Sequence, residues 1–134
     1  MHAEITVKTR DPLFILYVHD MNRAVAFYRE TFELELVQQT PGWSMLRFGA
    51  ATIALHMIFA GSEESVCKHA GINFQVDDLD SAIADVVTAG GEHVVTREPT
   101  DFVPVRMCEL KDSEGNGIEL RQFVGTAPDL TEIK

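Results

Sequence analysis

The sequence is poor in cysteine, in basic residues and in long apolar runs. Two cysteines among 134 residues, Cys67 and Cys108, are too few for the disulfide framework of a small secreted domain. The apolar run around Phe14 to Val18 is far shorter than the roughly 18 residues that cross a bilayer. The first residues also lack the charged-then-apolar layout of a signal peptide. We therefore expect a soluble, cytoplasmic protein rather than a secreted or membrane-spanning one.

Basic residues are outnumbered by acidic ones. Eleven Lys and Arg against 21 Asp and Glu give a formal net charge of −10. This balance repels the phosphate backbone and anionic membranes, so it argues against nucleic-acid and membrane partners and favours neutral or cationic ligands. At 46% hydrophobic and 24% charged residues, the composition is that of an ordinary folded protein. The length predicts a single domain over residues 1–134.

The sequence does contain an internal repeat. The segment Ile15–Met21 aligns with the segment Asn73–Leu79 at an offset of 58 residues. This alignment places Asp20 on Asp78, and the same offset continues without a gap through the apolar residues that follow each aspartate. A constant offset over so many positions indicates a duplicated unit.

Each copy follows the same order of elements. A short apolar strand ends at Asp20 or Asp78, which we expect to cap a helix whose apolar residues recur at helical spacing. Three strand-like stretches, separated by turn residues, follow each helix. They are Leu34–Gln39, Trp43–Phe48 and Ala51–Met57 in the first copy, and Glu92–Arg97, Val103–Leu110 and Gly117–Phe123 in the second. This order predicts an α+β fold of two tandem βαβββ modules, at about 13–58 and 71–124, joined by a linker at about 59–70.

The two helices are expected to end differently. Gly90 and Gly91 follow the second helix, where a left-handed backbone conformation commonly ends a helix. Phe32 and Glu33 occupy the corresponding places after the first helix, so the Glu33 backbone is expected to carry roughly 1 kcal/mol of strain.

Two segments carry a resemblance to a known superfamily. They are Val18–Tyr28, which contains the first helix cap, and Asp112–Leu120, which contains the run Asp-Ser-Glu-Gly-Asn-Gly. Together with the repeat, they make the chain similar to the vicinal oxygen chelate superfamily from about Leu13 to Phe123. That superfamily includes glyoxalase I, extradiol dioxygenases, and bleomycin- and fosfomycin-resistance proteins. The resemblance implies that each module curls into a half-barrel, that the halves enclose a cleft with helices outside, and that the chain forms a homodimer.

The resemblance also implies where a metal would bind. Metal-dependent members place their ligands early in the first strand and in the last strand of each module. These places fall on Leu13, Ala54, Gly71 and Glu119. Only Glu119 has a side chain that can coordinate a metal. We therefore expect no metal cofactor.

Strand alternation predicts which side chains share the cleft face with these positions, because residues two apart point the same way. The residues between them are apolar and suit packing against helices. Trp43 and Phe102 lie in related parts of the two modules and could wall a planar ligand, although a core or dimer-interface role is also open. The predicted ligand-binding residues are Tyr17, Trp43, His56, Asn73, Gln75, Phe102, Glu119 and Arg121.

Glu119 needs a partner if it is buried. Arg121 and His56 are the candidates, which suggests that a fixed side-chain cation replaces the metal charge. The alternative is a solvated Glu119–Arg121 ion pair of little energetic weight. A rearranged metal site made of His56, Glu119 and His69, with Cys67 in reserve, also stays open.

The sequence predicts a metal-independent protein that binds a small organic molecule and sequesters a drug or another organic ligand. One alternative is an enzyme, either a divalent-metal-dependent lyase, isomerase or dioxygenase with a rearranged site, or a metal-free acid–base catalyst using Glu119, His56 and Tyr17. Another is a binding or regulatory module with no catalytic role. Because superfolds host many chemistries, turnover of the ligand has to separate these alternatives.

Overall fold

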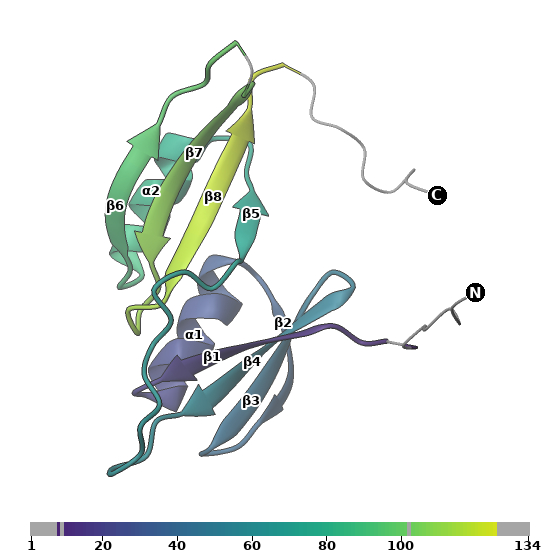
Figure 1. Cartoon of the computed structure of the whole chain (residues 1–134), viewed down its shortest axis with the longest axis vertical. Coiled ribbons are helices and arrows are strands. Elements are labelled where there is room, and N and C mark those ends of the chain that lie inside the picture. Colours follow the sequence, from purple (N-terminus) through teal and green to yellow (C-terminus); the bar gives the residue numbers. More distant parts are fainter. Residues whose placement is uncertain (1–7, 9, 102, 126–134) are drawn as a thin grey trace, which may run out of the picture.

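The computed structural model describes residues 8, 10–101 and 103–125. The elements in this part of the chain are β1 (Leu13–Val18), α1 (Met21–Thr31), β2 (Glu35–Gln39), β3 (Trp43–Phe48), β4 (Ala51–Met57), β5 (Asn73–Gln75), α2 (Leu79–Thr88), β6 (Glu92–Arg97), β7 (Val105–Lys111) and β8 (Gly117–Phe123). They form two separate four-stranded sheets, each with one helix, which confirms the predicted α+β fold (Figure 1). No described helix is both long enough and apolar enough to cross a bilayer.

The two sheets are built in the same way. Their strand orders are β1-β4-β3-β2 in module 1 and β5-β8-β7-β6 in module 2, and the first strand of each module runs parallel to the last. Ile15 pairs with Ala54 in module 1, and Asn73 pairs with Glu119 in module 2. Positions that the sequence repeat equates are therefore equivalent in the strand register as well.

The helix ends agree with the sequence prediction. The Asp20 and Asp78 side chains each accept a hydrogen bond from the backbone N–H three residues later, at 3.0 and 3.1 Å. These bonds satisfy donors that the first helical turn leaves unpaired. After the helices, Glu33 has a φ of 55° and Gly90 a φ of 107°. The left-handed conformation strains the glutamate but not the glycine.

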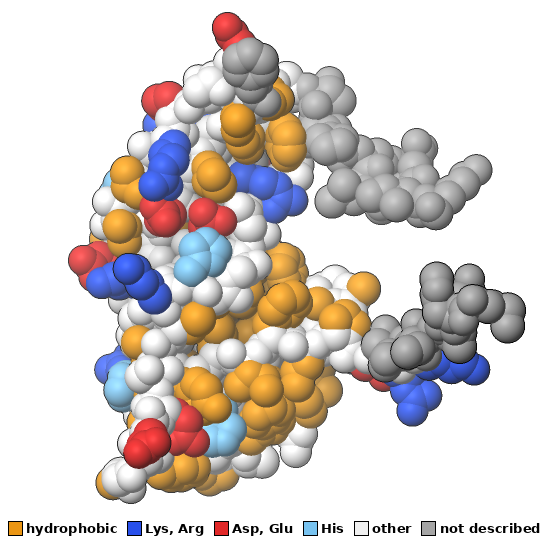
Figure 2. Space-filling model, viewed as in Figure 1, with side chains coloured by type: hydrophobic (Ala, Val, Ile, Leu, Met, Phe, Trp, Pro, Cys, Tyr) orange, Lys and Arg blue, Asp and Glu red, His pale blue; other side chains and the backbone are white. Residues whose placement is uncertain are grey.

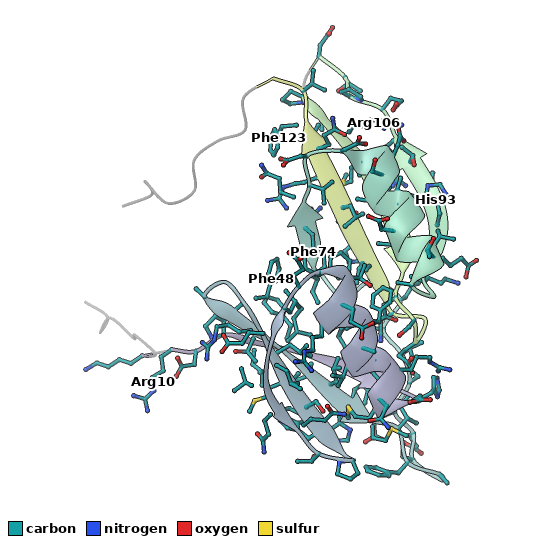
Figure 3. All side chains as sticks on the ribbon, turned by 180° about the vertical axis from the view of Figure 1, so that it is seen from behind. Arg10, Phe48, Phe74, His93, Arg106 and Phe123 are labelled. Atoms are coloured by element: carbon teal, nitrogen blue, oxygen red, sulfur yellow. The ribbon has the colours of Figure 1, made fainter. Side chains whose placement is uncertain are left out.

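One hydrophobic core connects the helix sides of both sheets. Helix α1 packs on the sheet of module 1 and α2 on that of module 2, and both helices lie on one side of the molecule (Figure 1 and Figure 3). Leu55 and Leu120 occupy equivalent positions under these helices, and both are fully buried. At the junction of the modules, Phe74 of β5 stacks on Phe32 with ring centroids 4.0 Å apart and lies 4.6 Å from Phe48 (Figure 3).

Three local features differ from the sequence expectation. Phe14, expected against the helix, is 41% exposed, whereas Leu16 and Val18 on the same face of β1 are buried. Ala54, expected on the cleft face, is fully buried because neighbouring strands flank its single methyl group on both sides. Strand β7 begins at Val105 rather than Val103, since Pro104 has no N–H to donate to a strand ladder.

The turn between β7 and β8, at 112–116, ties module 2 to module 1. The buried side chain of Glu114 accepts hydrogen bonds from the backbone N–H groups of His19 and Asp20, both at 2.8 Å, and from Arg23 Nε at 2.7 Å. Burial alone would raise the pKa of Glu114, but these hydrogen bonds hold it below its ordinary value. The carboxylate is therefore charged and anchors the start of α1.

A second connection in the same turn runs through Asn116, which is fully buried. Asn116 donates from Nδ2 to the Tyr17 carbonyl oxygen at 2.9 Å and accepts the Cys67 N–H at 2.6 Å. The Tyr28 hydroxyl donates to Asp112, whose pKa is raised by burial. These bonds hold the end of β1, and hence part of the candidate site, in a fixed position relative to module 2.

Candidate functional site

Both sheets turn their second face away from the helices, on one side of the molecule (Figure 1 and Figure 3). We call the open face of module 1, with Tyr17, Trp43, His56 and the adjoining Phe59, the aromatic face. We call the open face of module 2, with Asn73, Gln75, Glu119 and Arg121, the polar face. Figure 2 shows hydrophobic side chains gathered over the first and charged side chains over the second. Phe102, the remaining predicted residue, lies outside the described residues.

A row of three rings crosses the aromatic face. The strand register places Tyr17 and Trp43 on either side of His56, with ring centroids 5.1 and 6.0 Å from the imidazole. Phe59, which follows β4, has its ring 6.4 Å from the same imidazole. Trp43 and His56 meet edge to face, which is a favourable aromatic geometry. The row offers flat apolar surface of the kind that lines small-molecule sites.

The imidazole of His56 is held in one tautomer. Its Nδ1 lies 2.9 Å from the carbonyl oxygen of Met57. Because a carbonyl oxygen can only accept, the neutral ring carries its proton on Nδ1. The lone pair is therefore on Nε2, where it can accept a hydrogen bond from a ligand.

The polar face holds a hydrogen-bonded chain centred on Asn73. Arg121 Nη1 donates to Oδ1 and to the carbonyl oxygen of Asn73, at 2.8 and 3.0 Å. Its Nη2 donates to Gln75 Oε1 at 3.3 Å. Asn73 Nδ2 in turn donates to Glu119 Oε1 at 3.3 Å. The Asn73 amide thus stands between the cation and the carboxylate that the sequence suggested as an ion pair.

The expected partners of Glu119 were therefore wrong. Its carboxylate makes no direct contact with Arg121 or with His56, and the imidazole that reaches it is His69, with Nε2 3.4 Å from Oε1. His69 Nδ1 accepts the backbone N–H of Gly71 at 3.0 Å, so the neutral ring carries its proton on Nε2. His69 thus lies beside Glu119, whose side chain is 18% exposed, but the 3.4 Å approach is not a hydrogen bond.

The sequence suggested His69 near Glu119 only as part of a rearranged metal site, because strand alternation does not set side-chain direction within a linker. The signal that could have found this contact is Gly117 at the start of β8. The linker passes so close there that a Cβ on Gly117 would collide with the Lys68 carbonyl oxygen. Ala70 N–H also donates to the Gly117 carbonyl oxygen at 2.8 Å. A glycine in a strand often marks such a close backbone approach, and here it brings His69 beside Glu119.

The residues at the expected metal positions do not suit a metal ion. Leu13, Ala54 and Gly71 offer no side-chain donor, and Glu119 alone is a single carboxylate ligand. The rearranged set of His56, Glu119 and His69 is not grouped around one point either. Among residues 8, 10–101 and 103–125, no three His, Cys, Asp or Glu side chains are grouped to hold a metal.

Neither cysteine adds a reactive group to the site. Cys108 is buried in β7, and burial raises the pKa of its thiol to about 11. A thiol with such a pKa stays protonated and unreactive at neutral pH. Cys67 donates its S–H to the His69 carbonyl oxygen at 3.0 Å.

Two sizeable cavities open on the described surface. One of about 550 Å³ opens beside the start of α1 between Asp20 and Pro41, and one of about 560 Å³ opens at the Phe32–Phe74 junction. Gln75, a predicted ligand-binding residue, lines the second. The two unclosed sheets agree with the curved half-barrels that the sequence predicts.

Comparisons with known proteins agree with this fold. The family model described as Glyoxalase/Bleomycin resistance protein/Dioxygenase superfamily matches residues 10–120. A family enzyme of that description from Burkholderia phytofirmans PsJN is similar with a TM-score of 0.72 and 19% identity, over 87% of this chain and 100% of that chain. No curated protein sequence matches the chain significantly.

Two further solved structures are similar over most of the chain. A lactoylglutathione lyase from Agrobacterium tumefaciens has a TM-score of 0.65 and 18% identity, over 87% of this chain and 95% of that chain. A fosfomycin resistance protein from Mesorhizobium loti has a TM-score of 0.63 and 20% identity, over 95% of this chain and 98% of that chain. At these identities the likeness concerns the fold alone.

Proposed function

Because the chain belongs to the Glyoxalase/Bleomycin resistance protein/Dioxygenase superfamily, we propose that it binds a small organic molecule on its two open faces without a metal ion. The observation that carries this proposal is the donor set at the expected metal positions. Three of the four positions have no donor, and the fourth, Glu119, accepts a hydrogen bond from Asn73 and lies 3.4 Å from Nε2 of His69. One carboxylate alone is a poor site for a divalent ion, because tight binding needs several protein ligands.

The two open faces supply complementary parts of a ligand site. The aromatic face provides rings that stack on a flat organic group, and the polar face provides fixed hydrogen-bonding groups. Ligand sites typically combine apolar walls with a few polar groups that set orientation. The role that fits this combination is sequestration of a drug or another organic ligand.

A second copy of the chain completes the site in this proposal. Leu13 and Ile15 lie beside the aromatic face and are 43% and 48% exposed, and Phe59 is 54% exposed. Contiguous apolar side chains of this kind often mark an interface. A homodimer that covers them would enclose the open faces. Sedimentation equilibrium at micromolar concentration should give the dimer mass, and a monomer mass would contradict this part of the proposal.

A metal-free acid–base catalyst is the second candidate, and the observation that favours it is the tautomer of His56. The hydrogen bond at Nδ1 of His56 leaves the lone pair of the neutral ring on Nε2, where it can take a proton from a bound ligand. Mass spectrometry of a ligand after long incubation separates the two roles. Recovery of the unchanged ligand supports sequestration, whereas a product that fails to form with His56→Ala supports catalysis.

The metal content of the protein tests the leading proposal. Protein purified without chelator or affinity tag should hold far less than one metal ion per chain. Its melting temperature should not rise with Ni²⁺, Zn²⁺, Mn²⁺ or Fe²⁺. Glu119→Ala and His69→Ala are the test variants, and Glu63→Ala, which removes an exposed linker carboxylate, is the control. Near-stoichiometric metal, or a melting rise lost only in the test variants, would favour a metal-dependent lyase, isomerase or dioxygenase instead.

Ligand binding itself can be followed through Trp43. It is the single tryptophan of the chain and lies on the aromatic face, so its fluorescence reports on that face. Flat aromatic compounds should change this fluorescence saturably in the presence of EDTA. The effect should weaken in Tyr17→Ala and persist in Phe14→Ala, an exposed residue of the same strand on the other side of the sheet. Binding that needs an added metal would contradict the proposal.

A further inference from the structure

Arg121 carries a charge that the polar face does not neutralise. All three oxygens that accept from its guanidinium group are neutral amide or carbonyl oxygens of Asn73 and Gln75. No carboxylate of the described residues forms an ion pair with it. On the same face Arg97 does have such a partner, Glu109, at 2.6 Å. Arg121 therefore differs from the paired cation next to it.

The guanidinium group of Arg121 also keeps donors for a ligand. It has five N–H bonds. Two from Nη1 and one from Nη2 are used by Asn73 and Gln75. The Nε–H and the second Nη2 hydrogen have no acceptor among the described residues. Nε and Nη2 lie along one edge of the planar group, and this edge forms the fork that binds two oxygens of a carboxylate or phosphate.

The residues that hold Arg121 occur as a set in module 2 only. Asn73, Gln75 and Arg121 occupy the register positions at which module 1 has Ile15, Tyr17 and His56. A half-buried cation without a counter-charge costs stability unless neighbouring groups solvate it. The two amide side chains do this and also fix its direction. A ligand that supplies the missing negative charge would explain why these three residues occur together.

We propose that Arg121 binds the acidic group of the ligand, either a carboxylate or a phosphate-type group. This inference rests on the proposed binding function and names its ligand class as organic anions, whose flat part lies on the aromatic face. It reverses the expectation, drawn from the net charge of −10, that the ligand is neutral or cationic. Physiological salt screens exposed charges beyond about 8 Å. A direct two-pronged contact therefore outweighs acidic residues elsewhere on the surface.

Glu119 lies two residues before Arg121 on the polar face, but its carboxylate does not neutralise the guanidinium group. The Asn73 amide separates the two groups, and the Glu119 carboxylate accepts a hydrogen bond from Asn73 and lies 3.4 Å from Nε2 of His69. The Glu119 carboxylate is therefore hydrogen-bonded to Asn73 and not to Arg121. The fork of Arg121 is thus left for an anion that comes from solution.

Matched probes test the inference by calorimetry in EDTA. The probes are 2-naphthoate, its uncharged amide and 2-naphthylphosphonate, which share one ring system and differ in the polar group. Because hydrogen bonds to charged groups are strong, the acid should bind about tenfold or more tightly than the amide. The phosphonate arm shows which kind of acidic group is preferred. Arg121→Met keeps the apolar stem and should abolish the preference, whereas Arg97→Met is the control that should retain it.

The possible outcomes separate this inference from the proposed function. Equal binding of acid and amide, or a preference that survives Arg121→Met, overturns the role of Arg121 and leaves metal-free ligand binding intact. If neither probe binds, the nuclear magnetic resonance signal of the Arg121 Nε–H is followed while millimolar benzoate or inorganic phosphate is added. The absence of a saturable shift in this signal also overturns the role of Arg121. Failure of the proposed function shows differently, as bound metal or as binding that EDTA removes. Near-ultraviolet circular dichroism should show that Arg121→Met keeps the native fold.

Discussion

Module 1 and module 2 are alike on the side that faces the helices and different on the side that does not. On the helix side, Leu55 and Leu120 are equivalent and both fully buried. On the open side, His56 among aromatic rings stands where Arg121 is held by amide oxygens. Packing thus constrains one face of the repeated unit, while the other face carries separate chemical roles.

The modules also differ in the turn before their last strand. Module 1 connects β3 to β4 through Gly49 and Ala50 alone. Module 2 has the longer turn at 112–116, whose Glu114 and Asn116 side chains reach across to module 1. The contact between the modules is therefore asymmetric, although the sheets are built alike.

The largest expected effect tests the equivalence of the two helix sides. Leu55→Ala and Leu120→Ala should each lower the free energy of unfolding by about 3 kcal/mol, because each leaves a cavity in a closed core. Urea denaturation of both variants provides the measurement. If one substitution costs far less than the other, the helix sides of the modules are not equivalent and the comparison fails on that side.

The next effect tests the asymmetric turn. Asn116→Ala should cost about 2 kcal/mol, since the half-buried Cys67 N–H and Tyr17 carbonyl would both lose a partner. Asn22→Ala removes an exposed asparagine that bonds only to Gln39, and as the control it should change stability by less than about 0.5 kcal/mol. Equal effects in the same denaturation experiment would show that the turn does not hold the modules together.

Glu114→Gln should cost about 1–2 kcal/mol at neutral pH, because it removes the charge that accepts from Arg23. The native pKa of Glu114 is lowered, so its stabilisation is present above the ordinary glutamate pKa and is lost as the pH falls through the native value. The stability difference between the wild type and the variant should therefore shrink on acidification. A difference that stays constant down to acid pH would contradict a charged Glu114 carboxylate at this anchor.

The pH dependence expected at Asp112 has the opposite sign. Burial raises the native pKa of Asp112, so its contribution to stability is lost as the pH rises through that value.

The smallest effect tests the repeat at its helix starts. Asp20→Ala and Asp78→Ala each remove a single cap and should each lower the melting temperature by a few degrees. Differential scanning calorimetry can compare them directly. Asp20 and Asp78 make the same bond three residues onward, so clearly unequal shifts would mean that the two helices depend on their caps to different degrees.

Most of the fold was predictable because both copies of the sequence repeat show the same order of strands and helix. The offset places Asp20 on Asp78, and the strand register repeats the same correspondence. The period-two alternation separated the apolar helix side from the open side, with Phe14 as an exception at a sheet edge. The strain expected at Glu33 also appears as its positive φ. These features depend on local sequence, which is why the pattern sufficed.

The candidate site was predictable only in part. Alternation showed which side chains share a face, but it could not show which of them touch. The bridging role of Asn73 depends on side-chain geometry, and the contact of His69 with Glu119 depends on the path of an irregular linker. No periodicity within the chain encodes contacts with a second copy, so the proposed cover of the open faces could not be read from the pattern.

The most direct test of the account is a map of where a ligand binds. Backbone amide shifts should be recorded by nuclear magnetic resonance while 2-naphthoate is added in the presence of EDTA. The account predicts saturable shifts around Tyr17, His56, Asn73 and Arg121, on both open faces and without a metal. Shifts confined to the cavity at the Phe32–Phe74 junction, or shifts that appear only after a divalent metal is added, would contradict it.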